Sequence, residues 1–193
     1  MLKGSKTAEN LMKSFAGECQ ARTRYTYYSS IAKKEGYVQI ANIFMETAEQ
    51  EKEHAKRFFR FLKDELNGEA IEITAGYPVA LYNETLKNLE AAAAGEHEEW
   101  STDYPEFARI AREEGFLDIA VAFERIAEVE KRHEMRYRKL LENIKNDTVF
   151  KKEQTVLWKC NNCGYIYEGE EAPEVCPACL HPQGYFEVFI ENY

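Results

Sequence analysis

Two copies of a Glu-x-x-His pattern are the residues of this sequence best suited to binding a metal ion. They occur at Glu51/His54 and at Glu130/His133. Residues three apart on a helix project from the same face, so each pair can offer one oxygen and one nitrogen to a cation. A single copy means little in a chain rich in glutamate. However, the chain has only four histidines, and two of them occupy this position.

An internal repeat accounts for the two copies. Residues 31–62 align with residues 110–141 at an offset of 79 without gaps, and 14 of the 32 positions are identical. Upstream, the tripeptide Ala-Gly-Glu ends at Glu18 in one copy and at Glu96 in the other, an offset of 78. Each copy therefore carries an additional glutamate ahead of its Glu-x-x-His pattern.

The repeat predicts two copies of one helical hairpin. We expect four long helices over residues 5–35, 38–66, 80–114 and 117–145, with tight reversals at Gly36 and Gly115. Residues 67–79 must then run the length of the bundle, and such a long crossover is typical of a ferritin-like bundle. The change of offset places one extra residue in the third helix, near Pro105. It predicts a kink or a π-bulge there.

Helix geometry places the repeated glutamates at one level of the bundle. Glu18 lies 18 residues before Gly36 and Glu51 lies 15 after it, or roughly 27 and 22 Å along the helices. Glu96 and Glu130 are spaced in the same way around the second reversal. One glutamate from each of two helices, with Glu-x-x-His from the other two, is the ligand set of a di-iron or di-manganese bundle. Two divalent cations balance four buried carboxylates, and affinity alone leaves zinc open.

Other side chains fall close to this predicted site. Glu99 has no counterpart in the first copy, where Ala21 stands, and it supplies a fifth carboxylate unless it is an ordinary surface residue. His97 has no partner in the repeat, so we expect a neighbour of the site and not a ligand. Tyr25 and Tyr104 are expected either to donate hydrogen bonds to ligand carboxylates or simply to pack in the core.

Four of the five cysteines form two Cys-x-x-Cys pairs, Cys160/Cys163 and Cys176/Cys179. Four thiolates in this spacing form a tetrahedral site for iron or zinc, and the spacing alone does not choose between them. About 36 residues cannot build a self-sufficient core, so this module should depend on its metal. Cys19 stands alone in a helical stretch and is expected to be a small, partly buried residue.

Composition changes sharply near residue 150. We expect a helical domain over residues 1–147, a linker over 148–156 and a small metal-stabilised β/loop domain over 157–193. The fold class is therefore mainly α. The core of the small domain is expected to contain aromatic residues: Trp158, Tyr165, Tyr167, Phe186 and Phe189.

Charge and hydropathy exclude some partners. The 193-residue chain has a net charge of −9 and a pI near 5.1, which makes a general affinity for nucleic acid or anionic lipid unfavourable. The sequence has no apolar stretch near the roughly 20 residues that span a bilayer, and its first residues lack a signal-peptide pattern. The expected location is the cytoplasm.

These motifs together resemble the rubrerythrin family over nearly the whole chain. The resemblance rests on GECQARTRY (17–25), EQEKEHAKR (49–57), AGEHEEW (94–100), FARIAREEG (107–115), EVEKRHE (128–134) and WKCNNCGYIYEGEEAPEVCPACLHP (158–182). It implies a ferritin-like di-iron bundle followed by a rubredoxin-like domain with one iron bound by four cysteines.

The resemblance also implies a ligand for each iron. One iron would take Glu18, Glu51 and either Glu99 or His54. The second would take Glu96, Glu130 and His133, with Glu51 and Glu130 bridging both. In the family, Glu99 is thought to be exchanged for His54 upon reduction, which makes these two the implied catalytic residues.

The implied activity is the reduction of hydrogen peroxide to water in oxidative-stress defence. Electrons would come from rubredoxin or an NADH-linked reductase through the Fe(Cys)4 centre, within a head-to-tail homodimer. Cys19 departs from the family pattern, in which serine or another small residue is expected beside Glu18.

Two alternative functions remain open. An iron-storage shell would be recognised by light scattering, and a zinc ribbon on a structural bundle would lack the red colour of ferric thiolate.

Overall fold

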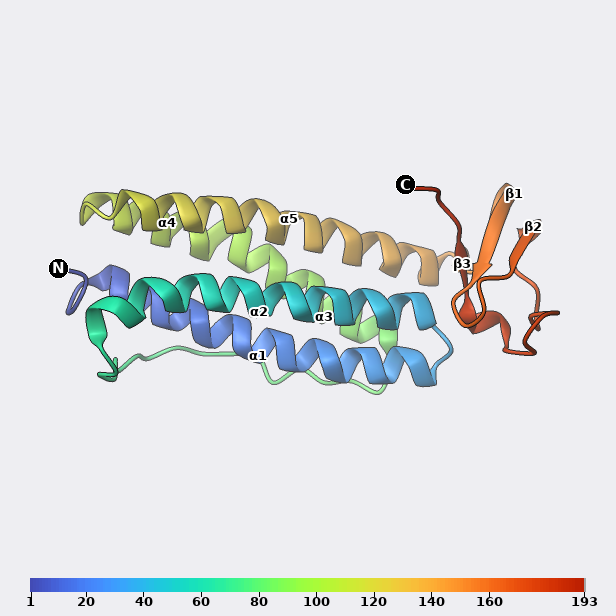
Figure 1. The fold of residues 1–193 in the computed structure, drawn as a ribbon, viewed down its shortest axis with the longest axis horizontal. Helices are drawn as coiled ribbons and strands as arrows, with labels where there is room; N and C mark the ends of the chain where they lie inside the picture. The colour runs from blue at the N-terminus through green and yellow to red at the C-terminus, as the bar shows by residue number, and fades with distance from the viewer. Residues whose placement is uncertain (193) are drawn as a thin grey trace.

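The computed structural model describes residues 1–192. A bundle of long helices forms the first part, and a small domain of strands lies at one end of it (Figure 1). The bundle consists of α1 (Lys6–Lys34), α2 (Val38–Leu66), α3 (Thr85–Glu98), the π-helix η1 (Glu99–Asp103), α4 (Tyr104–Glu113) and α5 (Leu117–Lys145).

The four predicted helical rods are confirmed, with α3, η1 and α4 continuing one another as the third. Gly36 and Gly115 end the first and third rods with φ near 85°, a conformation that is unstrained only for glycine. The third rod begins at Thr85 and not at residue 80. The Asn88 side chain explains the later start, because its amide accepts from the backbone N–H of Tyr82 and donates to the carbonyl of Tyr82.

The crossover joins α2 to α3 by running the length of the bundle beside α1 (Figure 1). Two tyrosines hold it in place. The Tyr77 hydroxyl donates to the Lys13 carbonyl at 2.8 Å, and the Tyr28 hydroxyl donates to the Ala80 carbonyl at 2.6 Å. The long connection predicted from the repeat is therefore present, and the bundle has the ferritin-like connectivity.

The π-helix η1 confirms the irregularity predicted in the third rod. It begins at Glu99 and is followed directly by α4, whose first turn contains Pro105. A π-turn accommodates one extra residue without breaking the helix, which explains the change of repeat offset from 78 to 79.

Two glutamates cap helices of the opposite hairpin. The Glu114 carboxylate accepts from the backbone N–H groups of Lys6 and Thr7, at 3.0 and 2.8 Å, at the start of α1. Its repeat counterpart Glu35 accepts from the N–H of Thr85 at 2.6 Å at the start of α3. A carboxylate at a helix N-terminus satisfies free N–H groups and favours the helix dipole. Each hairpin therefore caps a helix of the other.

Replacing Glu114 by alanine is expected to destabilise the bundle by about 1–2 kcal/mol, because the cap is lost. Thermal unfolding should shift downward by about 2–4 °C per kcal/mol. The matched control is Glu113→Ala, which removes only an exposed ion pair with Arg109 and should cost under about 0.5 kcal/mol. Equal effects of the two substitutions would contradict the capping role.

The core of the bundle is divided into two apolar clusters. One surrounds Tyr28, Phe44 and Tyr137 toward the Gly36 end, and the other surrounds Phe58 and Phe123 toward the opposite end. The repeated glutamates lie along the helices between these clusters. The polar site is therefore enclosed by apolar packing on both sides.

The small domain is a three-stranded antiparallel sheet in the order β2-β1-β3. Its elements are β1 (Lys151–Cys160), β2 (Ile166–Glu171), the short helix η2 (Gln183–Tyr185) and β3 (Phe186–Val188). The start of β1 corrects the predicted linker over 148–156. Residues 151–156 belong to the strand, with Lys151 paired to Glu171 and a register irregularity before Val156.

The aromatic core predicted for this domain is partly wrong. Trp158 and Phe186 are fully buried, but Tyr165 and Tyr167 are each more than a third exposed. They lie at or beside β2, which is an edge strand of the sheet. Phe150 from the preceding segment packs against the core instead.

The small domain abuts the α1–α2 reversal. Gly184 approaches the backbone of Gly36 so closely that a side chain there would collide with it. The rings of Tyr37 and Phe150 stack nearly parallel, with centroids 6.1 Å apart.

Among the described residues, no helix combines the length and apolarity that a membrane crossing requires.

Candidate metal centres

Four glutamates from four helices meet in the middle of the bundle. Glu18, Glu51, Glu96 and Glu130 come from α1, α2, α3 and α5, and each is at most 1% exposed. Their oxygens form two groups with ligand spacing, one that includes Glu18 and one that includes Glu96. Glu51 and Glu130 belong to both groups, so any two ions held there would be neighbours.

The two predicted histidines complete these groups. His54 directs Nδ1 at Glu130 and Glu51, at 2.8 and 2.9 Å. His133 directs Nδ1 at Glu130 at 2.8 Å and at Glu51 at 3.2 Å. The structure therefore places His54 with Glu18 and places His133 with Glu96, as the repeat pattern required.

The donor set fits a pair of cations. Glu18, Glu51, Glu96 and Glu130 each have at least one carboxylate oxygen that is fully buried and lacks a hydrogen-bond partner. Unpaired buried carboxylates are costly, whereas divalent cations would satisfy them. Burial, with repulsion from Glu51, raises the pKa of Glu18 and Glu96. The side chains of this site are therefore suited to binding cations.

Two buried tyrosines support the cage from the opposite hairpin. The Tyr25 hydroxyl donates to Glu96 and the Tyr104 hydroxyl donates to Glu18, each at 2.5 Å. Both are also buried in the apolar clusters, so both expected roles are present. Such hydrogen bonds fix the orientation of ligand carboxylates.

The two histidines differ in their outer contacts. Nε2 of His133 lies 2.9 Å from the side-chain oxygen of Gln50. The repeat counterpart of Gln50 is Val129, which has no polar group to offer His54. Sequence reasoning missed Gln50, although the repeat alignment carried the signal as a polar residue opposite an apolar one.

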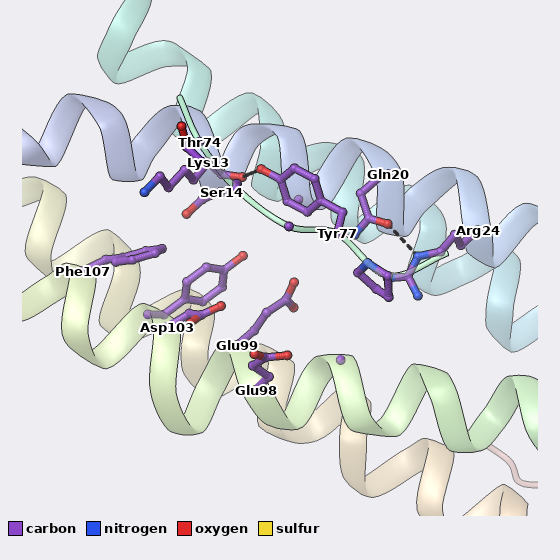
Figure 2. A pocket seen from close by; sticks show the side chains of 16 residues that line it. Lys13, Ser14, Gln20, Arg24, Thr74, Tyr77, Glu98, Glu99, Asp103 and Phe107 are labelled. Atoms are coloured by element: carbon purple, nitrogen blue, oxygen red, sulfur yellow. Dashed lines mark hydrogen bonds between the residues drawn. The ribbon is translucent and has the colours of Figure 1, made fainter. Parts of the chain in front are cut away.

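Glu99 lies beside the cage and not within either ligand group. It is half-buried on η1, and its carboxylate points toward α1 (Figure 2). Burial, together with the charge of Glu96, raises the pKa of Glu99 well above its usual value. Glu99 therefore stands between the metal cage and the cavity that this side chain lines.

The remaining predicted neighbours lie outside the cage. His97 is half exposed, with Nδ1 3.1 Å from Glu134, which also accepts from the Trp100 indole N–H. Cys19 is exposed on the outer face of α1. The expectation that it is partly buried is wrong, because its position falls on the solvent side of the helix that carries Glu18 inward.

The four predicted cysteines converge in the small domain. Sγ of Cys160 lies 3.7 Å from that of Cys179, and Sγ of Cys163 lies 3.7 Å from that of Cys176. All four sulfurs lie within 4.8 Å of one another. A backbone hydrogen bond from His181 lowers the pKa of Cys179 to about 6, which favours the thiolate that metals bind. The cluster fits one tetrahedral ion.

A crossover bundle with four buried glutamates and two inward histidines defines a ferritin-like protein with a two-metal site. The appended four-cysteine cluster narrows the class further. The family model described as Rubrerythrin matches residues 9–141, and the one described as rubrerythrin, rubredoxin-like domain, matches residues 158–187. The chain belongs to the rubrerythrin family, whose members are di-iron oxidoreductases of oxidative-stress defence.

Relatives agree over the full length. The chain is 68% identical to rubrerythrin of Clostridium perfringens and 52% identical to rubrerythrin of Nitratidesulfovibrio vulgaris, covering all of this chain and 98% of each relative. Among solved structures, fully reduced, all-ferrous nigerythrin matches with a TM-score of 0.65 and 32% identity, over 98% of this chain and 92% of that one. A bacterioferritin from Desulfovibrio desulfuricans, described with a diiron site, matches with a TM-score of 0.66 and 28% identity, over 74% and 82%.

Proposed function

We propose that this protein is a peroxidase that reduces hydrogen peroxide to water at a di-iron site. The observation that carries the proposal is that the two ligand groups share Glu51 and Glu130, which would hold two ions side by side. One ion would take Glu18 and His54 in addition, and the other Glu96 and His133. Glu99, which lies beside the cage and outside both ligand groups, would be a further, exchangeable ligand of the first ion in place of His54.

Iron held by these residues would supply two electrons, one from each ion. Reduction of one peroxide to two water molecules consumes these two electrons and two protons. Glu99 is suited to carry a proton, because it lies beside the cage and lines the cavity and because burial raises its pKa. Tyr25 and Tyr104 hold the carboxylates of Glu96 and Glu18 in place while charge changes at the cage.

The four-cysteine site would hold one iron and return electrons singly to the bundle. Cys163 and neighbouring Leu180 are exposed, which supports docking of a donor such as rubredoxin or an NADH-linked reductase. Within one chain this domain lies beyond Gly36, roughly 22 Å of helix from Glu51. We therefore propose a head-to-tail homodimer, acting in the cytoplasm, in which the small domain of one subunit approaches the bundle of the other.

A stopped-flow titration of the fully reduced, iron-loaded protein tests the activity. We expect one peroxide to oxidise one pair of bundle irons, because each peroxide accepts two electrons. Metal analysis should give three irons per chain, and light scattering should give a dimer. Absence of rapid oxidation by peroxide, or a closed shell of many subunits, would overturn the proposal in favour of another function for the same bundle.

A further inference from the structure

A cavity of about 300 Å³ lies between the crossover, α1 and the third helical rod (Figure 2). Crossover residues 74–78 form one side of it. Glu99 lies in its wall, as does Tyr104, whose hydroxyl donates to Glu18. The cavity therefore borders one carboxylate that lies beside the cage and one hydroxyl that is hydrogen-bonded to a cage glutamate.

The wall of the cavity contains an unpartnered polar group. Ser14 on α1 is only 4% exposed, and its hydroxyl has no hydrogen-bond partner. A buried hydroxyl in this state is unfavourable unless a small molecule completes its hydrogen bonding. Gln20, Arg24 and Asp103 add further polar groups to the lining. The cavity is therefore suited to a small polar molecule that can form hydrogen bonds with its wall.

Two glycines in helix interiors keep this space open. Gly17 and Gly95 are repeat counterparts, and both line the cavity. Glycine inside a helix is less stable than alanine, because it loses more backbone freedom on folding. Close packing does not require it here, because a Cβ on Gly95 would meet nothing within 4 Å and one on Gly17 would meet only the Tyr77 ring at 3.6 Å. Larger side chains at these positions would instead occupy the cavity.

We propose that this cavity is the entrance through which hydrogen peroxide reaches Glu99 and the metal cage, and that Gly17 and Gly95 keep it open. The identity of the substrate rests on the proposed function. A hydrogen bond from the Tyr77 hydroxyl to the Lys13 carbonyl fixes the crossover beside the entrance.

The test fills the cavity from opposite walls with Gly95→Leu and Ser14→Leu. Ala94→Leu is the matched control, because Ala94 is an exposed neighbour of Gly95 that does not line the cavity. Two rates are measured on iron-loaded protein by stopped flow: association of azide with the oxidised form, and oxidation of the reduced form by hydrogen peroxide. Iron content and the Kd of azide are measured alongside.

Both cavity-filling variants should slow azide association and peroxide oxidation by about tenfold or more. A tenfold decrease corresponds to an increase of about 1.4 kcal/mol in the activation free energy for entry. An obstructed entrance slows entry and exit equally, so the Kd of azide should stay within about twofold of wild type, whereas a damaged metal site would change it. The control should match wild type in every measurement. If azide associated with both filled variants at the wild-type rate, the cavity would not be the entrance. A wild-type protein that binds azide through the cavity but fails to react with peroxide would overturn only the proposed activity.

Discussion

Substitution of Cys160 by serine is expected to abolish peroxide turnover driven by NADH and an electron-transfer partner. Cys160 is 1% exposed and its sulfur lies 3.7 Å from that of Cys179, so the substitution removes one of four metal ligands. Loss even of an outer-shell partner costs about 10–100-fold in metal affinity, and the small domain depends on its ion for folding. The red colour of a ferric thiolate centre should disappear with the activity.

The same variant should keep the chemistry of the bundle. After chemical reduction, its di-iron site should be oxidised by hydrogen peroxide at the wild-type rate, because the cage lies in a separate domain. Cys19→Ser is the matched control, since this exposed thiol lies outside the cluster. NADH-linked turnover at the wild-type rate in a Cys160→Ser protein that holds bundle iron but no iron at the cysteine site would mean that donors reach the bundle directly.

The repeat made the bundle and much of the candidate site predictable from sequence. Glu51, His54, Glu130 and His133 recur at one offset, so each copy supports the interpretation of the other. The same alignment located the π-turn, because a single inserted residue changes the offset. Patterns of this kind can be interpreted from sequence because the spacing of residues along a helix fixes the directions in which their side chains project.

Features that depend on contacts between distant segments could not be predicted. The position of Glu99 beside the cage, and not inside it, depends on the rotation that η1 introduces. The reciprocal caps by Glu35 and Glu114 require the two hairpins to be docked. The exposure of Tyr167 depends on which strand lies at the sheet edge. None of these relations has a short-range signature.

Removal of the bundle metals should leave a protein whose stability falls as the pH rises. Burial and the charge of Glu51 raise the pKa of Glu18 and Glu96 above 4.5, so the folded state keeps protons that the unfolded chain has lost. Burial alone would lower the pKa of His54, but the neighbouring carboxylates of Glu130 and Glu51 raise it to about 10 from 6.5. The stabilisation from these carboxyls is complete below about pH 4.5, that from His54 below about pH 6.5, and both are lost as the pH rises.

Thermal unfolding of metal-free and iron-loaded protein from pH 5.5 to 8.5 measures this slope. Each retained proton contributes about 1.4 kcal/mol per pH unit, so the metal-free midpoint should fall by about 5 °C or more. Bound cations replace the protons, so the unfolding midpoint of the iron-loaded protein should change little with pH.

Metal-free Glu18→Gln should be more stable than the metal-free parent at pH 8, because it buries no charge at this position. Iron binding should stabilise this variant less than it stabilises the parent. The exposed substitution Glu128→Gln should change neither quantity. A metal-free protein that becomes more stable as the pH rises across this window would contradict a cage built to hold positive charge.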